Sequence, residues 1–193
     1  GNNVTEGNTS MKAILGGKGA NLAEMANIGL PVPPGFTITC QTCMEYANAG
    51  NAWPEGALGT IQEYREDLEA RMGKKIGDAE DPLLVSVRSG APMSMPGMMD
   101  TVLNLGLNDQ SINGLIKQTD NPRFAWDSYR RFIQMFSNVV MNLDGDLFEN
   151  AITAMKHARG AASDTDLTAE DLQELVAEFK QIFAENVDAA AYP

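Results

Sequence analysis

The hydrophobic pattern changes its period several times in the first half of the chain, which predicts a mixture of helices and strands. Apolar residues at helical spacing predict helices at residues 20–28, 41–49 and 60–72. Short runs rich in β-branched residues predict strands at residues 36–39, 83–88 and 101–105. Gly29 and Gly50 follow the first two helices, where glycine commonly ends a helix. We expect residues 1–107 to form an α/β lobe.

The pattern after residue 107 is helical almost throughout. Asn121 and Pro122 have the form of a helix cap with proline at the first helical position, and residues 168–171 have the form of a capping box. A further helix is expected at residues 147–157. The stripe behind the first cap consists of Phe124, Ala125, Tyr129, Phe132, Ile133, Phe136, Val139 and Val140. The stripe behind the capping box consists of Leu172, Leu175, Val176, Phe179, Ile182 and Phe183. Such stripes predict core-facing helices, so residues 108–193 are expected to form a helical subdomain, and the fold class is α+β.

Composition and charge narrow the classes of partner. The chain has 193 residues, 44% of them hydrophobic, and a chain of this length buries about 70% of its unfolded surface without help from disulfides or metals. A net charge of −12 argues against nucleic acid or an anionic membrane as a partner. The sequence has no leader and no long apolar run, so we expect a cytoplasmic protein. One acidic group is expected on the solvated face of a helix: Asp164, Asp166, Glu170, Asp171, Glu174 and Glu178.

The two cysteines, Cys40 and Cys43, form a C-x-x-C pair, a spacing that suits zinc or redox chemistry. Zinc would need two more ligands, and the single histidine, His157, lies far along the chain. A redox pair would stand at a helix start, and Cys43 is placed where a helix is predicted to open. The interpretation that we favour is two small buried thiols at a strand-to-helix junction.

A glycine-rich turn with one lysine, Gly16-Gly17-Lys18-Gly19, leads into the first predicted helix. Glycines let backbone N–H groups approach an anion, the helix N-terminus favours negative charge, and lysine adds a mobile cation. The spacing does not fit the P-loop motif G-x-x-x-x-G-K-[ST]. Alone, the turn predicts either a phosphate site or an ordinary turn before a helix.

Arg88 stands at the end of the strand predicted at residues 83–88 and opens into a loop. An arginine held by a strand presents a planar fork that matches phosphate oxygens. The alternative is a surface arginine that pairs with any nearby carboxylate.

The loop that follows is rich in methionine: four of the chain's 11 methionines fall within residues 93–99, spaced by proline and glycine. This spacing fits neither a helix nor a strand. It suits a flexible apolar cover over a ligand, because methionine adapts its shape and glycine lets the backbone come close. The alternative is an irregular buried loop.

Four segments, taken in order, resemble the start of the pyruvate phosphate dikinase family. They are residues 16–22 (GGKGANL), 30–36 (LPVPPGF), 87–91 (VRSGA) and 95–106 (MPGMMDTVLNLG). Residues 123–132 fit as well, and the resemblance covers residues 11–187. The related phosphoenolpyruvate synthases share the glycine–lysine turn and the Val-Arg-Ser strand end. They lack the Met-Pro-Gly-Met-Met loop, which favours the dikinase.

The resemblance implies a reaction, a fold and roles for particular residues. The family converts ATP, phosphate and pyruvate reversibly into AMP, pyrophosphate and phosphoenolpyruvate, and its nucleotide domain resembles the ATP-grasp fold. By this resemblance residues 1–107 would be an incomplete ATP-grasp-like lobe. Lys18 would bind the triphosphate, and Arg88 would contact phosphates and offset charge that develops in transfer. Residues 95–99, with Gly97, Met98 and Met99, would close over the transferring phosphates.

The resemblance also implies parts that lie beyond Pro193. These are the second ATP-grasp lobe with the acidic Mg²⁺ ligands, the phosphohistidine domain and the barrel that handles pyruvate, and the full-length enzyme would be a homodimer. We expect no metal site in this chain, since Asp144 and Asp146 read as a turn around Gly145. His157 does not match the Gly-Gly-Ser-His motif that contains the family's phosphoryl-carrying histidine, and it is expected at a helix end. The chain is therefore expected to be an N-terminal fragment that is inactive alone.

Two other interpretations stay open. The chain could be a stand-alone nucleotide-binding or interaction module that reuses the dikinase lobe without turnover. It could also be a piece of a phosphoenolpyruvate synthase or a glucan dikinase, which the methionine loop disfavours.

Overall fold

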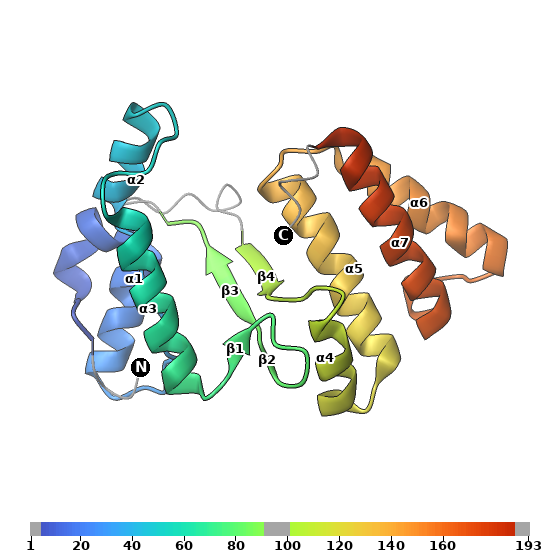
Figure 1. Cartoon of the computed structure of the whole chain (residues 1–193), viewed down its shortest axis with the longest axis horizontal. Coiled ribbons are helices and arrows are strands. Elements are labelled where there is room, and N and C mark those ends of the chain that lie inside the picture. The colour runs from blue at the N-terminus through green and yellow to red at the C-terminus, as the bar shows by residue number, and fades with distance from the viewer. Residues whose placement is uncertain (1–4, 91–100, 188–193) are drawn as a thin grey trace. The chain divides into compact units, whose positions relative to one another are not determined.

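A computed structural model of the chain describes residues 5–90 and 101–187. These residues form seven α-helices, two short 3-10 helices and four short strands, so helices and small sheets occur together as the α+β class requires (Figure 1). The chain divides into two compact units, which are described separately below. The first holds the described residues of Gly1–Gly73 and Arg88–Asp100, and the second holds those of Lys74–Val87 and Thr101–Pro193. The division at residue 107 into a nucleotide-binding lobe and a helical subdomain stays a prediction.

The first unit is built from helices. They are η1 (Thr9–Met11), α1 (Lys12–Asn27), α2 (Cys40–Asn48) and α3 (Ala57–Met72). All three predicted helices are thus confirmed, although α1 and α3 begin earlier than expected. Gly29, with φ 84°, ends α1 as predicted, because its N–H donates to the carbonyl of Ala26 and that of Leu30 donates to Met25.

The strand predicted at residues 36–39 is wrong, since no strand is formed there. The alternation of apolar residues with threonine fits an extended chain, but a strand also needs a hydrogen-bonded neighbour. The described part of the chain places no such neighbour beside this segment.

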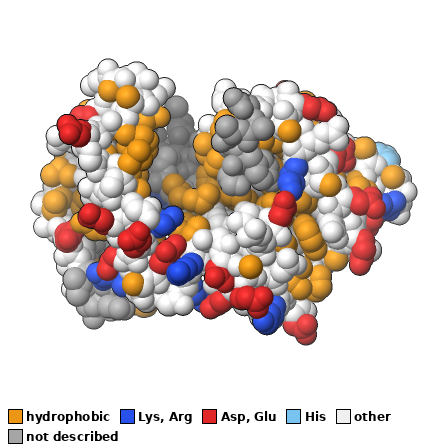
Figure 2. All heavy atoms as spheres, in the orientation of Figure 1, with side chains coloured by type: hydrophobic (Ala, Val, Ile, Leu, Met, Phe, Trp, Pro, Cys, Tyr) orange, Lys and Arg blue, Asp and Glu red, His pale blue; other side chains and the backbone are white. Residues whose placement is uncertain are grey.

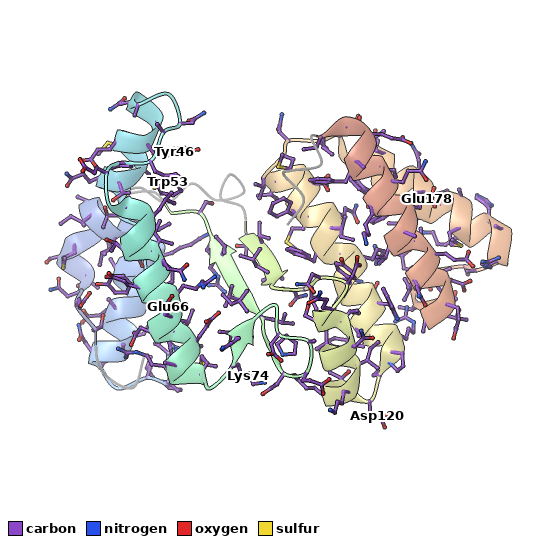
Figure 3. All side chains as sticks on the ribbon, in the orientation of Figure 1. Tyr46, Trp53, Glu66, Lys74, Asp120 and Glu178 are labelled. Carbon is purple, nitrogen blue, oxygen red and sulfur yellow. The ribbon has the colours of Figure 1, made fainter. Side chains whose placement is uncertain are left out.

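The interior of the first unit is made of small residues. Its buried hydrophobic side chains, among those described, are Ala20, Ala23 and Ala26, on one face of α1. Neither α2 nor α3 has a buried residue. Larger side chains meet nearer the surface, as where the ring centroids of Tyr46 on α2 and Trp53 in the loop after it lie 4.9 Å apart (Figure 3). The first unit therefore buries little apolar surface for its size.

The second unit begins with short strands. Strand β1 (Lys75–Ile76) runs parallel to β2 (Pro82–Leu83), with Lys75 opposite Pro82, and β3 (Val85–Arg88) pairs with β4 (Thr101–Leu105). Strand β4 is confirmed at its predicted bounds. The single strand predicted at residues 83–88 is interrupted at Leu84 instead, because the segment changes its pairing partner from β1 to β4 there.

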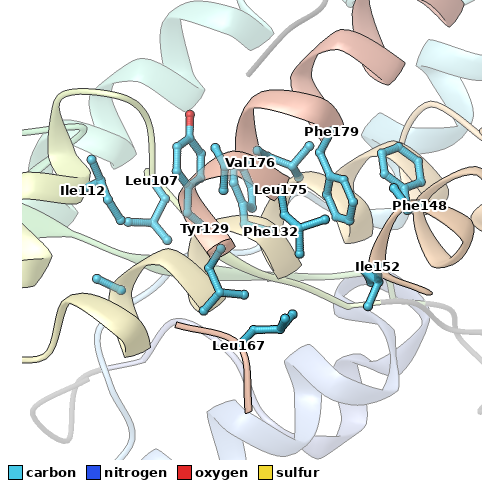
Figure 4. Close-up of a cluster of buried hydrophobic side chains, with 14 of the residues drawn as sticks. Leu107, Ile112, Tyr129, Phe132, Phe148, Ile152, Leu167, Leu175, Val176 and Phe179 are labelled. Carbon is cyan, nitrogen blue, oxygen red and sulfur yellow. The ribbon is translucent and has the colours of Figure 1, made fainter. Parts of the chain in front are cut away.

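Helices supply the core of the second unit. They are α4 (Ser111–Thr119), α5 (Pro122–Val139), α6 (Gly145–Arg159), η2 (Asp164–Asp166) and α7 (Ala169–Asn186). Helix α5 packs against α7, α4 and β4, and α6 packs against α7. Large side chains fill the space between them, including Phe148 and Phe179, whose rings meet edge to face with centroids 4.9 Å apart (Figure 4). This unit has the conventional core that the first unit lacks.

The predicted caps and stripes of these helices are largely confirmed. Asn121 accepts the Phe124 N–H, and Thr168 and Asp171 form the reciprocal capping box of α7. The predicted core-facing stripe of α5 is wrong at its two ends. Phe124, Val139 and Val140 are exposed, because a helix longer than the surface it packs on leaves its terminal turns in solvent. The α7 stripe is buried except for Ile182, which is half-buried.

The prediction that this acidic group lies on a solvated helix face is partly wrong, because two of its members are buried or half-buried and make ion pairs there. Asp171 is only 8% exposed and accepts from Arg159 as well as from the capping-box N–H of Thr168. Asp164 lies in η2, where it accepts from Lys156 at 2.9 Å and faces the buried guanidinium of Arg130 at 3.6 Å. These carboxylates anchor the loop between α6 and α7.

On the visible surface of each unit, acidic side chains are spread out, with hydrophobic side chains among them (Figure 2). None of the helices within residues 5–90 and 101–187 combines the length and apolarity needed to span a bilayer.

Replacing Phe179 by alanine should cost about 3–5 kcal/mol of unfolding free energy, because it removes a fully buried ring and leaves a cavity. Urea unfolding followed by circular dichroism measures this loss. The matched control is Phe124→Ala, which removes the same ring from a half-exposed site and should cost about 0.5 kcal/mol. Equal costs at the two positions would contradict the packing described here.

The ion pairs of Asp164 should stabilise the fold at neutral pH and cease to do so in acid. The hydrogen bond from Lys156, with the charges of Lys156, Arg130 and Arg131, holds the pKa of Asp164 below its ordinary 3.8, against the opposing effect of partial burial. The unfolded chain therefore takes up the proton first, and the stabilisation is lost as pH falls from about 4 through the lower folded pKa.

Urea unfolding of the wild type and Asp164→Asn over a pH series measures this effect. The difference in unfolding free energy between the wild type and Asp164→Asn should be constant around neutral pH and should disappear in acid. Glu178→Gln is the control, on the exposed side of α7, and should show no gap (Figure 3). A gap for Asp164→Asn that persists unchanged in acid would refute the assignment.

Candidate phosphate-binding turn in the first unit

Helix α1 is broken at Gly16, the first glycine of the predicted turn. Gly16 has φ 70° and ψ 168° and is buried, and this conformation is essentially restricted to glycine. The helix resumes at Gly17, so Gly17, Lys18 and Gly19 form its first turn after the break. First-turn N–H groups lack the usual intrahelical acceptors, and the helix dipole adds partial positive charge there. The geometry has the elements of an anion-binding turn.

Gly19 brings a second motif against this turn. A Cβ at Gly19 would lie 3.3 Å from the Thr37 Oγ1 and 3.2 Å from the Leu15 Cβ, closer than most real Cβ contacts. Thr37 follows the Pro-Pro-Gly-Phe segment directly. Close packing therefore favours glycine at position 19, whereas at position 16 glycine is required by the backbone torsion.

Gly90 brings a third motif to the same place. A Cβ at Gly90 would lie 4.0 Å from the carbonyl oxygen of Leu15, the residue that precedes the break in α1. Strand β3 ends at Arg88, two residues before this contact. The Val-Arg-Ser-Gly segment and the glycine turn, far apart in sequence, thus meet within the first unit.

Within residues 5–90 and 101–187, the two predicted cations of the site have no side-chain partner. Lys18 is half-buried and Arg88 is exposed, and neither makes a hydrogen bond or ion pair with another described residue. By contrast, most cations of the second unit are paired, as Lys156 is with Asp164 and Arg159 with Asp171. The interpretation of Arg88 as a surface arginine that pairs with a nearby carboxylate is not supported within the described residues.

The methionine loop lies outside the described residues, and with it Gly97, Met98 and Met99. Among the described residues, the structure brings Gly90, two residues after Arg88, near Leu15, three residues before Lys18. The roles of Lys18, Arg88 and the methionine loop stay predictions. Leu15 and Thr37 were missed by sequence reasoning. The glycine at position 19 signals a close approach, but a sequence alone does not say which segment approaches.

The other candidate residues take structural roles or none. Asp144 caps α6 by accepting the Asp146 N–H, and His157 lies in the last turn of α6, as expected. No three His, Cys, Asp or Glu side chains within residues 5–90 and 101–187 gather as a metal site. The expectation for the cysteines is wrong: both are free, Cys40 is half-buried and opens α2, and Cys43 is exposed. With no strand paired at residues 36–39, nothing buries them at a strand-to-helix junction.

Residues 12–58, which contain the glycine turn and Thr37, match the family model described as the pyruvate phosphate dikinase AMP/ATP-binding domain. This match places the turn in a nucleotide-binding domain, the class of protein that its geometry suggests.

Three relatives that align with nearly the whole chain identify its family. The chain is 56% identical over 188 residues to pyruvate, phosphate dikinase from Clostridium symbiosum, which is 97% of this chain and 22% of that protein. It is 55% identical over 185 residues to pyruvate, phosphate dikinase 2 from Zea mays, 96% of this chain and 21% of that protein. For the Giardia intestinalis enzyme the identity is 53% over 171 residues, 89% of this chain and 19% of that protein.

With more than half of its residues identical to these relatives, the chain belongs to the pyruvate phosphate dikinase family, and the resemblance drawn from its motifs is confirmed. The phosphoenolpyruvate synthase interpretation is not favoured. The chain spans about a fifth of the length of the curated relatives that it matches. Some relatives are named as chloroplastic, so the cytoplasmic location stays a prediction.

Gly16→Ala should destabilise the chain by about 1–3 kcal/mol, because alanine is strained at a positive φ with an extended ψ. Thermal and urea unfolding by circular dichroism measure the loss. The control is Gly59→Ala in α3, where a Cβ meets nothing within 4 Å and alanine should stabilise by about 0.4–1 kcal/mol. An unchanged stability for Gly16→Ala would show that the break in α1 is not required.

Proposed function

We propose that this chain contributes part of the ATP-binding site of a pyruvate phosphate dikinase, which converts ATP, phosphate and pyruvate into AMP, pyrophosphate and phosphoenolpyruvate. The observation that carries the proposal is the approach of Gly90 to Leu15, since it joins two segments with the chemistry of phosphate binding. The AMP/ATP-binding family match over residues 12–58 covers one of them.

Lys18 binds the triphosphate in this proposal. It follows the break in α1, so its ammonium group can act on the same anion as the first-turn N–H groups. Its lack of a carboxylate partner in the described residues leaves it available to a ligand, and this matters in a chain with net charge −12.

Arg88 contacts the phosphates and offsets the charge that develops as a phosphoryl group is transferred. Its planar guanidinium suits two phosphate oxygens at once, and β3 fixes the backbone that carries it. Catalysis of phosphoryl transfer is mostly positioning and charge stabilisation, so a fixed cation is the contribution that such a strand end can make. Residues 95–99, with Gly97, Met98 and Met99, close over the phosphates.

The fold proposed for the first unit is part of an ATP-grasp-like lobe. The magnesium ion that accompanies ATP is assigned to no residue here, because the described residues gather no set of three potential ligands. Its ligands belong to the second ATP-grasp lobe of the whole dikinase. The phosphohistidine domain and the pyruvate barrel are further partners, and the full-length enzyme is a homodimer.

Titration of the chain with Mg·ATP should reveal weak binding, with Kd near 1 mM, about −4 kcal/mol, because only part of the pocket is present. Phosphorus NMR detects binding of this strength through shifts of the β- and γ-phosphate signals. Lys18→Ala and Arg88→Ala should each abolish the shifts, since losing a charged hydrogen bond costs about 1.5–3 kcal/mol.

The controls are Lys12→Ala and Arg65→Ala, which remove exposed cations elsewhere in the first unit and should leave the shifts unchanged. Equal losses in all four variants would mean that ATP senses only net charge, which would refute the assignment of Lys18 and Arg88. Micromolar affinity lost only in the two site variants would favour a self-sufficient nucleotide-binding module.

A further inference from the structure

The C-x-x-C pair at the start of α2 is a motif of the first unit to which the proposed function gives no role. Cys40 is the first residue of α2, and Cys43 lies in its first turn. They are the only cysteines in the chain. Both are reduced, Cys40 half-buried and Cys43 exposed, so solvent and small reagents reach the pair.

We propose that Cys40 and Cys43 form a reversible dithiol–disulfide site that closes within the first turn of α2. Residues three apart on an α-helix have Cα atoms about 5 Å apart, from a rise of 1.5 Å per residue and a Cα radius of about 2.3 Å. Disulfides span Cα separations of about 4.4–6.8 Å. The backbone of α2 thus already holds the two residues within bonding range.

The side chains need only a local adjustment to bond. Helical neighbours three apart have Cβ atoms about 5–6 Å apart, and a disulfide requires about 3.5–4.5 Å. The first turn can supply this shift because it has the fewest intrahelical hydrogen bonds. Thr39 anchors the turn from outside, since its Oγ1 accepts the Thr42 N–H at 3.2 Å and its carbonyl accepts the Cys43 N–H at 3.1 Å. The disulfide can therefore form without unfolding α2.

The reaction is an exchange with a low-molecular-weight disulfide such as oxidised glutathione. The exposed Cys43 thiolate attacks one sulfur of that disulfide, forms a mixed disulfide and releases one thiol. Cys40 then attacks the Cys43 sulfur, closes the Cys40–Cys43 bond and releases the second thiol. Two hydrogen atoms leave the protein and appear on the two released thiols, so the protein is oxidised and the reagent is reduced.

Thr37 lies three residues before Cys40 and packs on Gly19, so the dithiol is close in sequence to the candidate phosphate-binding turn. The proposal does not rest on ATP binding. It follows from helix geometry and accessibility alone, and its test reads out covalent chemistry.

The test treats the reduced chain with oxidised glutathione and follows intact mass and iodoacetamide labelling. The wild type should lose two hydrogen atoms in mass, and its labelled thiols should fall from two to none, with both restored by dithiothreitol. Circular dichroism should show unchanged helix content. Cys40→Ser and Cys43→Ser, each with one thiol, should instead retain a bound glutathione, and Cys40→Ser should acquire it faster.

Three results would overturn the proposal. A wild type that keeps stable glutathione adducts would show that the two sulfurs do not reach each other. Disulfide-linked dimers would place the partner thiol on another chain. Two labelled thiols that persist under oxidised glutathione would show that the pair is inert. Faster reaction of Cys43→Ser would overturn the order of attack.

Discussion

The geometry of the candidate site depends on the backbone torsion at Gly16. By breaking α1, it starts a new helical turn beside Leu15, whose carbonyl faces Gly90 and whose side chain crowds Gly19. A straight helix would carry its hydrogen-bond ladder through this point and present no free N–H groups. The geometry of the candidate site thus depends on a single residue type at one position.

Each of the two units is stabilised internally by different interactions. In the second, phenylalanine and leucine side chains fill the space between α5, α6 and α7, and partly buried ion pairs fix the loop at η2. In the first, alanines on α1 allow close backbone approach but exclude little water, and large side chains such as Met44 and Leu58 stay exposed. A unit with this surface gains stability when more chain covers it, which agrees with relatives about five times as long.

Sequence reasoning predicted elements whose signals are local. The glycine stop after α1, the Asn121 cap and the Thr168 capping box depend on neighbouring residues, and all three are confirmed. The predictions were wrong where a residue or strand distant in sequence determines the local structure. The segment at residues 36–39 forms no strand, Leu84 interrupts another, and Asp171 is held by Arg159 rather than by solvent. At the site, residue types pointed to Lys18 and Arg88, whereas the packing of Thr37 on Gly19 could not be predicted, because composition does not encode which segments meet.

The proximity of Gly90 to Leu15 also has a consequence for the order of folding. It closes a loop that contains α1, α2 and α3, so the glycine turn is completed only after the chain has been made as far as β3. Closing so long a loop costs entropy that few large apolar contacts in this unit offset. The packing of α5 on α7 in the second unit joins segments that are closer in sequence than Leu15 and Gly90. During synthesis or refolding, the glycine turn should therefore be among the last features to become ordered.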